Sequence, residues 1–325
     1  MATWPARKVL ALAIGIVCPP ALKPWVLGWC CQIDTGPGAR IGWLAAVAAK
    51  RIRLGPRAAI QPFTIISLDG DLTMGADAEI SSFNLVYGSS SLEIGDDAYV
   101  GPQSLINADE PVRLGTLSAL GARSVVYTHG SFLPYTEGYV SRRAPVEVES
   151  RVHCAAGVFL HPGTRIGEES FVSSRSVVSG EVAAGSVVRG NPAEVIGSMD
   201  GLRRRMSPAR VDLALRRILD DYVETGLRRE LDVEPASSNA DGIVFEHRGR
   251  RYRVVLVPSD AEHVSVPPDD GQLTVWVVNR REPVVPAGSV VFNVPAGVVT
   301  ASRDPIARSL RRFMLRYYGV RFKDS

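Results

Sequence analysis

Five histidines are the first candidates for proton transfer in this chain, because the pKa of histidine lies closest to neutral pH. His129 is the strongest of them, since it follows Thr128 where a regular sequence pattern gives way to an irregular stretch. The cysteines form no C-x-x-C pair, and no histidine stands at a zinc-ligand spacing from them. We therefore interpret the cysteines as small buried apolar residues; they are Cys18, Cys30, Cys31 and Cys154.

The pattern that ends near His129 is a repeat with a period of twenty residues. Within each repeat the apolar positions recur every six residues, and a second block from Val148 to Val182 keeps that spacing. Such a period fits neither a helix nor plain strand alternation. It predicts short strands joined by tight turns, three to a coil, with stacked coils sharing one core. The main columns are Gly55, Gly75, Gly95 and Gly115; Ile60, Ile80, Val100 and Leu120; Ile66, Val86, Ile106 and Val126; and Thr64, Asn84, Ser104 and Ser124.

Two further runs make this pattern specific, VVYTHG at residues 125–130 and GSVVRGNPAEVI at residues 185–196. With them, the chain resembles the hexapeptide-repeat acyltransferases over about residues 33–198, and among these the galactoside, maltose and capsule O-acetyltransferases. The resemblance implies a left-handed parallel β-helix, an acyl-CoA donor and no metal. It also implies a homotrimer with active sites between neighbouring subunits.

A thioester is already activated, so acyl transfer needs mainly a base for the acceptor hydroxyl and donors for the oxyanion. The catalytic histidine of the family stands at the position of His129. One repeat earlier, the same column holds Asp109, and adjacent coils lie about 4.8 Å apart. We therefore expect the Asp109 carboxylate beneath His129, where it would fix the imidazole tautomer and stabilise the imidazolium. The alternative is that Asp109 is a turn residue, as Asp69 is in its own coil.

The donor side departs from the family pattern. The run at residues 154–157 matches a segment that contacts the pantetheine arm of CoA in relatives. However, Ser173 stands where the family often has glycine, and a common phosphate-binding lysine corresponds to about Gly180. Arginine would then supply the charge for the CoA phosphates, and the donor is acetyl-CoA or another acyl-CoA. The expected donor contacts are His153, Ala155, Ala156, Arg175 and Arg189.

The repeat breaks at residues 130–145, and a long insertion in a regular scaffold is a functional candidate. In the family, a loop here extends over the active site of the neighbouring subunit. Phe132, Tyr135 and Tyr139 would stack on a sugar ring, and Arg142 would meet a phosphate of a nucleotide or lipid carrier. The alternative is a tolerated surface insertion.

Residues 1–32 form an apolar segment in which the basic pair Arg7 and Lys8 precedes a run too short to span a bilayer. We expect a broken apolar cap on the β-helix. Because Trp25 and Trp29 stand in this segment, peripheral contact with the inner face of the membrane is an alternative for a protein otherwise expected in the cytoplasm. A signal peptide is the third alternative, although no clean cleavage site follows.

The period ends after Ile196, and the remaining chain reads as a helical connector at 199–232 and a small α+β domain at 233–325. Ser207 and Pro208 mark a helix start. The second domain carries no catalytic motif, and its role is left open. Its strands are expected at about 242–247, 251–257, 272–279 and 288–294, before a helix that begins at Asp304 and Pro305.

Composition narrows the classes of function. A balance of 37 basic and 34 acidic residues gives no nucleic-acid footprint, and a 46% hydrophobic content excludes a disordered chain. The sequence predicts an O-acetyltransferase that acts on a sugar or glycoconjugate hydroxyl in polysaccharide biosynthesis. One alternative is a non-catalytic β-helix scaffold that has lost CoA binding. A γ-type carbonic anhydrase is disfavoured, because His129, His153 and His161 lack the required H-x4-H spacing.

Overall fold

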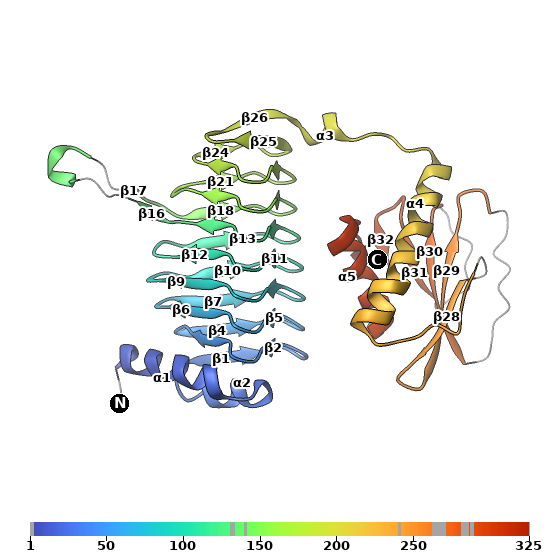
Figure 1. The fold of residues 1–325 in the computed structure, drawn as a ribbon, viewed down its shortest axis with the longest axis horizontal. Coiled ribbons are helices and arrows are strands. Elements are labelled where there is room, and N and C mark those ends of the chain that lie inside the picture. Colours follow the sequence, from blue (N-terminus) through green and yellow to red (C-terminus); the bar gives the residue numbers. More distant parts are fainter. Residues whose placement is uncertain are drawn as a thin grey trace. The chain divides into compact units, whose positions relative to one another are not determined.

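The computed structural model describes residues 3–130, 134–139, 142–239, 242–261, 271–280, 286 and 289–324. The chain divides into two compact units, Met1–Arg203 and Arg204–Ser325 (Figure 1). The fold predicted from the sequence is confirmed: a left-handed parallel β-helix with an apolar N-terminal cap, followed by a helix and a small α+β unit.

The cap consists of α1 (Trp4–Val17), a 3₁₀ turn (Pro20–Leu22) and α2 (Lys23–Leu27). Its inner side packs closely on the first coil, since a Cβ atom on Gly15 would lie 2.8 Å from the Cα atom of Ala46. The buried Lys23 amine donates hydrogen bonds to the carbonyl oxygens of Gly42 and Ala45, at 2.6 and 2.8 Å. The cap therefore closes the end of the hydrophobic core instead of leaving the first coil open to water.

Three parallel sheets form the walls of the β-helix. The first contains β1 (Gln32–Thr35), β4 (Arg51–Leu54), β7 (Asp71–Met74), β10 (Leu92–Ile94), β13 (Val112–Leu114), β18 (Val146–Val148), β21 (Arg165–Ile166) and β24 (Glu181–Val182). The second contains β2 (Arg40–Ile41), β5 (Ala59–Ile60), β8 (Glu79–Ile80), β11 (Tyr99–Val100), β14 (Ala119–Leu120), β19 (His153–Cys154), β22 (Phe171–Val172), β25 (Ser186–Gly190) and the antiparallel β26 (Ala193–Ser198). The third contains β3 (Ala46–Ala48), β6 (Ile65–Leu68), β9 (Leu85–Gly88), β12 (Leu105–Asn107), β15 (Val125–Val126), β20 (Phe159–Leu160) and β23 (Val177–Val178).

The register of these sheets reproduces the columns of the repeat. Leu54 pairs with Met74, which pairs with Ile94, so each of these coils advances by twenty residues. Across the insertion, Leu114 pairs with Val148, and the stack continues with shorter coils. The inward side chains of the columns are almost fully buried, so they form one continuous aliphatic core along the β-helix.

Glycine recurs in the repeat because successive coils approach closely at that position. A Cβ atom on Gly95 would lie 2.5 Å from the backbone nitrogen of Thr116 in the next coil. The left-handed backbone of the turn falls two residues later and is occupied by non-glycine residues, with φ of 55° at Asp77 and 53° at Asp97. Close packing of the backbone, and not a positive φ, therefore selects glycine in this column.

The small polar column forms a buried ladder between coils. The Thr64 hydroxyl accepts from the Asn84 backbone N–H at 3.3 Å, and the Asn84 side-chain oxygen accepts from the Ser104 N–H at 2.8 Å. The Ser104 hydroxyl then accepts from the Ser124 N–H at 3.1 Å. Each side chain thus satisfies a backbone donor of the next coil, which a buried turn requires.

The second unit follows α3 (Met199–Leu202). It contains α4 (Pro208–Asp221), which continues as a π-helix (Tyr222–Glu230), and α5 (Pro305–Tyr318). Its sheet has the order β27 (Ser237–Asn239), β28 (Gly242–His247), β29 (Arg250–Val257), β30 (Gln272–Val278), β31 (Val290–Asn293), β32 (Val298–Val299) and β33 (Lys323–Asp324). The core lies between these helices and one sheet face, around Tyr222, Phe245 and Phe313. None of the helices in the described part of the chain has the length and apolar character needed to span a bilayer.

Candidate active site

His129 lies at a corner of the β-helix where the insertion leaves the stack. It begins β16 (His129–Gly130), directly after β15 of the third sheet and before β18 of the first. β16 pairs antiparallel with β17 (Arg142–Arg143), so the insertion starts as a two-stranded projection. The short strand pair fixes the backbone on either side of the imidazole.

The imidazole contacts two side chains of the preceding coil. Its Nδ1 atom lies 3.0 Å from Oδ2 of Asp109 and 3.0 Å from Oδ1 of Asn107. The side chain of His129 is 42% exposed, so part of the imidazole faces solvent. Because both oxygens at Nδ1 are hydrogen-bond acceptors, Nδ1 carries the proton of the neutral ring, and the lone pair is on Nε2.

Asn107 also belongs to this site, although the repeat pattern of the sequence did not predict it. It is fully buried, and its Oδ1 atom also accepts from the hydroxyl of Thr128 at 2.9 Å. Its amide nitrogen donates to Oδ2 of Asp109 at 3.2 Å. Asn107 therefore locks the carboxylate and the imidazole into one hydrogen-bonded group.

The Asp109 carboxylate is held in its ionised form. Burial alone would raise the pKa of Asp109, but hydrogen bonds from Asn107 and Ser89 and the neighbouring His129 outweigh burial, so the pKa lies below its usual range. The Ser89 backbone N–H donates to Oδ1 at 3.0 Å. An ionised carboxylate at Nδ1 stabilises the imidazolium that forms when Nε2 takes a proton.

Aromatic rings line the wall beside His129. The ring of Tyr127 lies 6.1 Å from the imidazole and stacks on Phe159 at 5.9 Å. The ring of Phe159 in turn lies 4.8 Å from His161, which is exposed after β20. Burial and the hydroxyl of Tyr127 raise the pKa of Tyr87 in the same wall, so this phenol stays protonated and neutral. The wall offers an apolar surface next to the imidazole of His129.

The expected donor contacts gather on a different edge of the β-helix. Ala155 and Ala156 lie at the corner between the second and third sheets. The Arg175 backbone N–H donates to the carbonyl oxygen of Ala156 at 3.0 Å. Arg189 lies one coil further along, where the Ser173 N–H donates to the carbonyl of Val188. His153 is on the second sheet itself, with its ring stacked on Phe171 at 5.8 Å. Within one chain, this edge is not the edge that carries His129.

Only some of the residues expected to contact the acceptor lie within the described part of the chain. Phe132 lies outside the described residues. Tyr135 belongs to a 3₁₀ turn (Tyr135–Glu137), and Tyr139 is 47% exposed. Arg142 pairs with Gly130 in the two-stranded projection, and its guanidinium lies against Gly163, since a Cβ atom there would be 2.6 Å from Nη2. Arg142 is thus placed beside the corner of His129.

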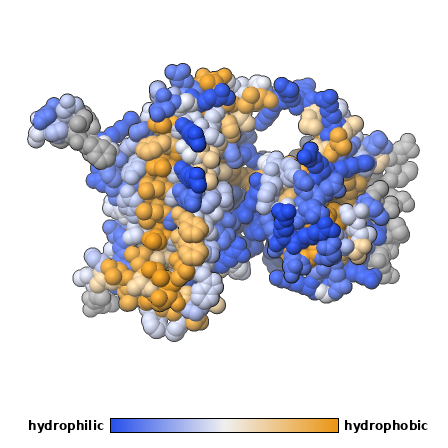
Figure 2. All heavy atoms as spheres, in the orientation of Figure 1, coloured by the Kyte–Doolittle hydropathy of each residue, from blue (hydrophilic) through white to orange (hydrophobic). Residues whose placement is uncertain are grey.

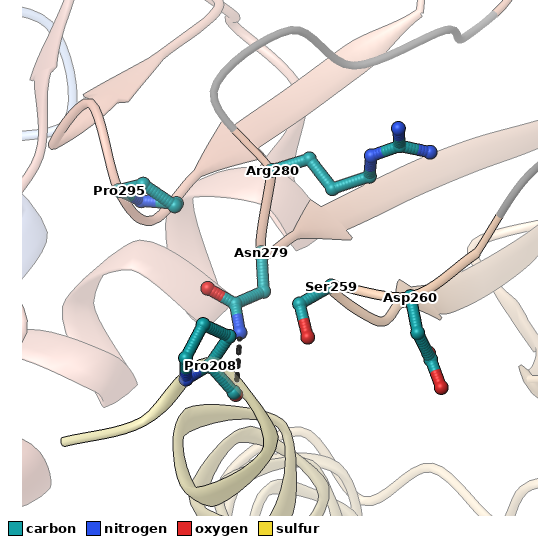
Figure 3. A pocket seen from close by; sticks show the side chains of 6 residues that line it. All are labelled: Pro208, Ser259, Asp260, Asn279, Arg280 and Pro295. Atoms are coloured by element: carbon teal, nitrogen blue, oxygen red, sulfur yellow. Dashed lines mark hydrogen bonds between the residues drawn. The ribbon is translucent and has the colours of Figure 1, made fainter.

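The second unit holds a separate cavity of about 400 Å³ at the carboxyl ends of β29, β30 and β31, lined by Pro208, Ser259, Asp260, Asn279, Arg280 and Pro295 (Figure 3). Two of these lining residues donate hydrogen bonds to the buried Asp212: the Ser259 hydroxyl at 2.6 Å and the Asn279 amide at 2.8 Å. These bonds join α4 to the ends of two strands. Nowhere in the described ranges do histidine, cysteine and acidic side chains form a cluster that could hold a metal ion.

No protein-family model and no curated protein matches the chain. Several solved structures, in contrast, are similar to part of the chain. A hexapeptide-repeat-containing acetyltransferase from Vibrio cholerae O1 biovar eltor, complexed with acetyl coenzyme A, is 17% identical over 60% of this chain and 86% of its own, with a TM-score of 0.35. A galactoside acetyltransferase in complex with coenzyme A is 14% identical over 63% and 87% of the two chains, with a TM-score of 0.32. A maltose O-acetyltransferase from Clostridium difficile 630 is 15% identical over 60% and 83%, with a TM-score of 0.33.

Proposed function

We propose that the chain is an acyl-CoA-dependent acyltransferase that moves an acetyl or similar acyl group to a hydroxyl of a sugar or glycoconjugate. The observation that carries this proposal is the arrangement at His129, where Asp109 and Asn107 hold Nδ1 on a part-exposed imidazole and leave the lone pair on Nε2. A direct transfer from a thioester needs such a base and no covalent enzyme intermediate. The proposal also rests on the family resemblance of the sequence.

In the proposed reaction, the acceptor hydroxyl attacks the thioester carbonyl carbon while Nε2 of His129 takes its proton. The carbonyl oxygen becomes an oxyanion, which backbone N–H groups stabilise. The C–S bond then breaks, the ester remains on the acceptor, and the imidazolium returns its proton to the CoA thiolate. Asp109 acts on the imidazolium throughout, because its carboxylate stays ionised at neutral pH.

The corner between the second and third sheets is suited to bind the acyl-CoA donor, because it combines small side chains with arginines. Ala155 and Ala156 present small side chains at this corner, and Arg175 and Arg189 bring positive charge for the CoA phosphates. Since this edge and His129 lie on different edges of one chain, we infer that neighbouring subunits bring them together. We place the reaction in the cytoplasm, because acyl-CoA is the donor.

The outward surface of the third sheet supports a homotrimer. Its register column is apolar in six successive coils, whereas the first sheet carries a column of mostly charged residues from Arg53 to Glu181 (Figure 2 shows an orange stripe along the β-helix). An outward-facing apolar stripe that is exposed or half-buried along its length is typical of a protein interface. The column is Ile65, Leu85, Leu105, Val125, Phe159 and Val177.

The oligomeric state can be tested by analytical ultracentrifugation. We expect the wild-type chain to sediment as a trimer and Leu85→Glu to sediment as a monomer, since a charge would be buried in the stripe. Leu85 is 40% exposed in the single chain, so the substitution spares the core. A monomeric wild type would contradict the trimer.

Two measurements test the reaction. Calorimetry should detect binding of acetyl-CoA, and thiol release should be observed with at least one member of a panel of free and nucleotide-linked sugars. Absence of acetyl-CoA binding would contradict the proposal and favour the scaffold alternative. Binding of acetyl-CoA without turnover of any sugar would support acetyl-CoA as the donor and contradict a sugar as the acceptor.

A further inference from the structure

The outer side of the N-terminal cap exposes an unusual amount of apolar surface. Its inner side packs on the β-helix through residues such as Ala11 and Leu27, which are fully buried. Large apolar side chains on the outer side are about half to three-quarters exposed, and Figure 2 shows hydrophobic surface gathered over this end of the β-helix. A contiguous patch of this kind marks a binding surface. We define the cap patch as Val9, Leu10, Ile16, Val17, Leu22, Trp25 and Trp29.

Tryptophan is concentrated in the same region. Four of the five tryptophans lie within the first 43 residues, and the fifth, Trp276, is buried in the second unit. Trp25 and Trp29 are 64% and 66% exposed, and their rings form an edge-to-face pair at 4.8 Å. An exposed tryptophan pair is unfavourable in water but suits the boundary between lipid headgroups and acyl chains.

Charge is distributed unevenly along the chain. Residues 1–68 contain eight basic residues and one acidic residue, Asp34, which gives a net charge of +7. The whole chain has a net charge of +3, so residues 69–325 carry −4. Lys8 pairs with Asp69 and Lys23 is buried, but Arg40, Lys50 and Arg53 are exposed on the first two coils. The end of the β-helix beside the cap patch is therefore cationic.

We propose that the cap patch binds the surface of an anionic phospholipid bilayer. The tryptophans and aliphatic residues of α1 and α2 would enter the headgroup region, and the arginines and lysine of the first coils would meet lipid phosphates. The helices lie across the end of the β-helix, so the cap would rest on the bilayer without crossing it (Figure 1). The inference goes beyond the proposed reaction and does not depend on it.

Charge favours a bilayer over a second copy of the chain as the occupant of the patch. Two copies that met cap to cap would bring two cationic ends together, with Arg40, Lys50 and Arg53 exposed on each, and like charges repel. An anionic lipid surface offers the opposite sign together with an apolar interior. A single partner would therefore match both the apolar cap patch and the positive charge beside it.

The test is co-sedimentation of the full chain with vesicles of phosphatidylcholine alone and of phosphatidylcholine mixed with phosphatidylglycerol. We expect binding to the anionic vesicles, weakening with added salt as surface charges are screened. Phospholipids with brominated acyl chains should quench the tryptophan fluorescence. Binding of neither kind of vesicle by the wild-type chain would overturn the proposal.

A pair of variants tests whether the cap patch is responsible. Trp25→Ser with Trp29→Ser should weaken binding to anionic vesicles by more than about tenfold, because two large apolar groups no longer enter the bilayer. The matched control is Val195→Ser with Ile196→Ser, an exposed apolar pair on β26 at the opposite end of the β-helix, which should bind as the wild type does.

Circular dichroism and sedimentation of both variants check that the fold is retained. Equal vesicle binding by the tryptophan variant and the wild type would overturn the proposal. So would self-association that requires the two tryptophans and occurs without vesicle binding, since a second copy would then be the occupant. Acyl transfer to a water-soluble sugar should be equal in the wild type and the tryptophan variant, which separates this inference from the proposed reaction.

Discussion

The Oδ2 atom of Asp109 lies 3.0 Å from the Nδ1 atom of His129, although twenty residues separate them. One coil of the β-helix contains twenty residues at this point, so the two side chains leave successive coils at the same corner. Asn107 bonds to both of them from the buried end of β12. The regular scaffold thus assembles a carboxylate and an imidazole, and the insertion begins where they meet.

Replacing Asp109 by asparagine should lower kcat by about ten- to a hundredfold, because the imidazolium loses its ionised partner. The pH profile of kcat/KM should change as well, because the group at Nδ1 is no longer an ionised carboxylate. The profile is measured by thiol release over a range of pH. Near-normal turnover with an unchanged profile would show that Asp109 is a turn residue only.

Asp212 should make the stability of the second unit depend on pH. Burial opposes ionisation of Asp212, but hydrogen bonds from Ser259 and Asn279 prevail and hold its pKa below the usual value. Its stabilising contribution is therefore present above the unfolded pKa of about 3.9 and is lost as pH falls through the folded pKa. Asp212→Asn should cost about 1–3 kcal/mol at neutral pH, measured by urea unfolding. A difference from the wild type that does not shrink at acid pH would contradict this assignment.

Gly95→Ala should destabilise the β-helix, because the new Cβ atom would lie 2.5 Å from the backbone of the next coil. Overpacking of this kind costs about 1–3 kcal/mol. The control is Gly197→Ala, where the structure leaves the added Cβ without a heavy atom within 4 Å and φ is not positive. Thermal unfolding should show a lower transition temperature for Gly95→Ala than for the wild type and Gly197→Ala. Equal transition temperatures would mean that the coils can move apart to accommodate the Cβ atom at no cost in stability.

The β-helix can be predicted from the sequence because residues in one column of the repeat contact each other in successive coils. Residues twenty apart are register partners, so the buried faces and the approach of Asp109 to His129 follow from the period alone. Asn107 could not be found in this way. Its column partner in the next coil is Tyr127, and it reaches Nδ1 of His129 only because the chain turns the corner after β15.

In the second unit, the strands and helices can be predicted from the sequence, but the way they pack together cannot. The contact of Asp212 with Ser259 joins residues 47 apart, and that of Pro208 with Asn279 joins residues 71 apart. Neither separation belongs to a period, so the cavity at the strand ends has no signature in the sequence. Long-range packing alone creates it.

The most direct test of the proposed activity is thiol release from acetyl-CoA with a productive acceptor, compared between the wild type and His129→Ala. We expect the rate to fall by about a hundred- to ten-thousandfold while calorimetry shows acetyl-CoA binding unchanged, because His129 is assigned to proton transfer and not to the donor edge. His247→Ala in the second unit is the control and should retain full activity. Equal thiol release by His129→Ala and the wild type would contradict His129 as the general base.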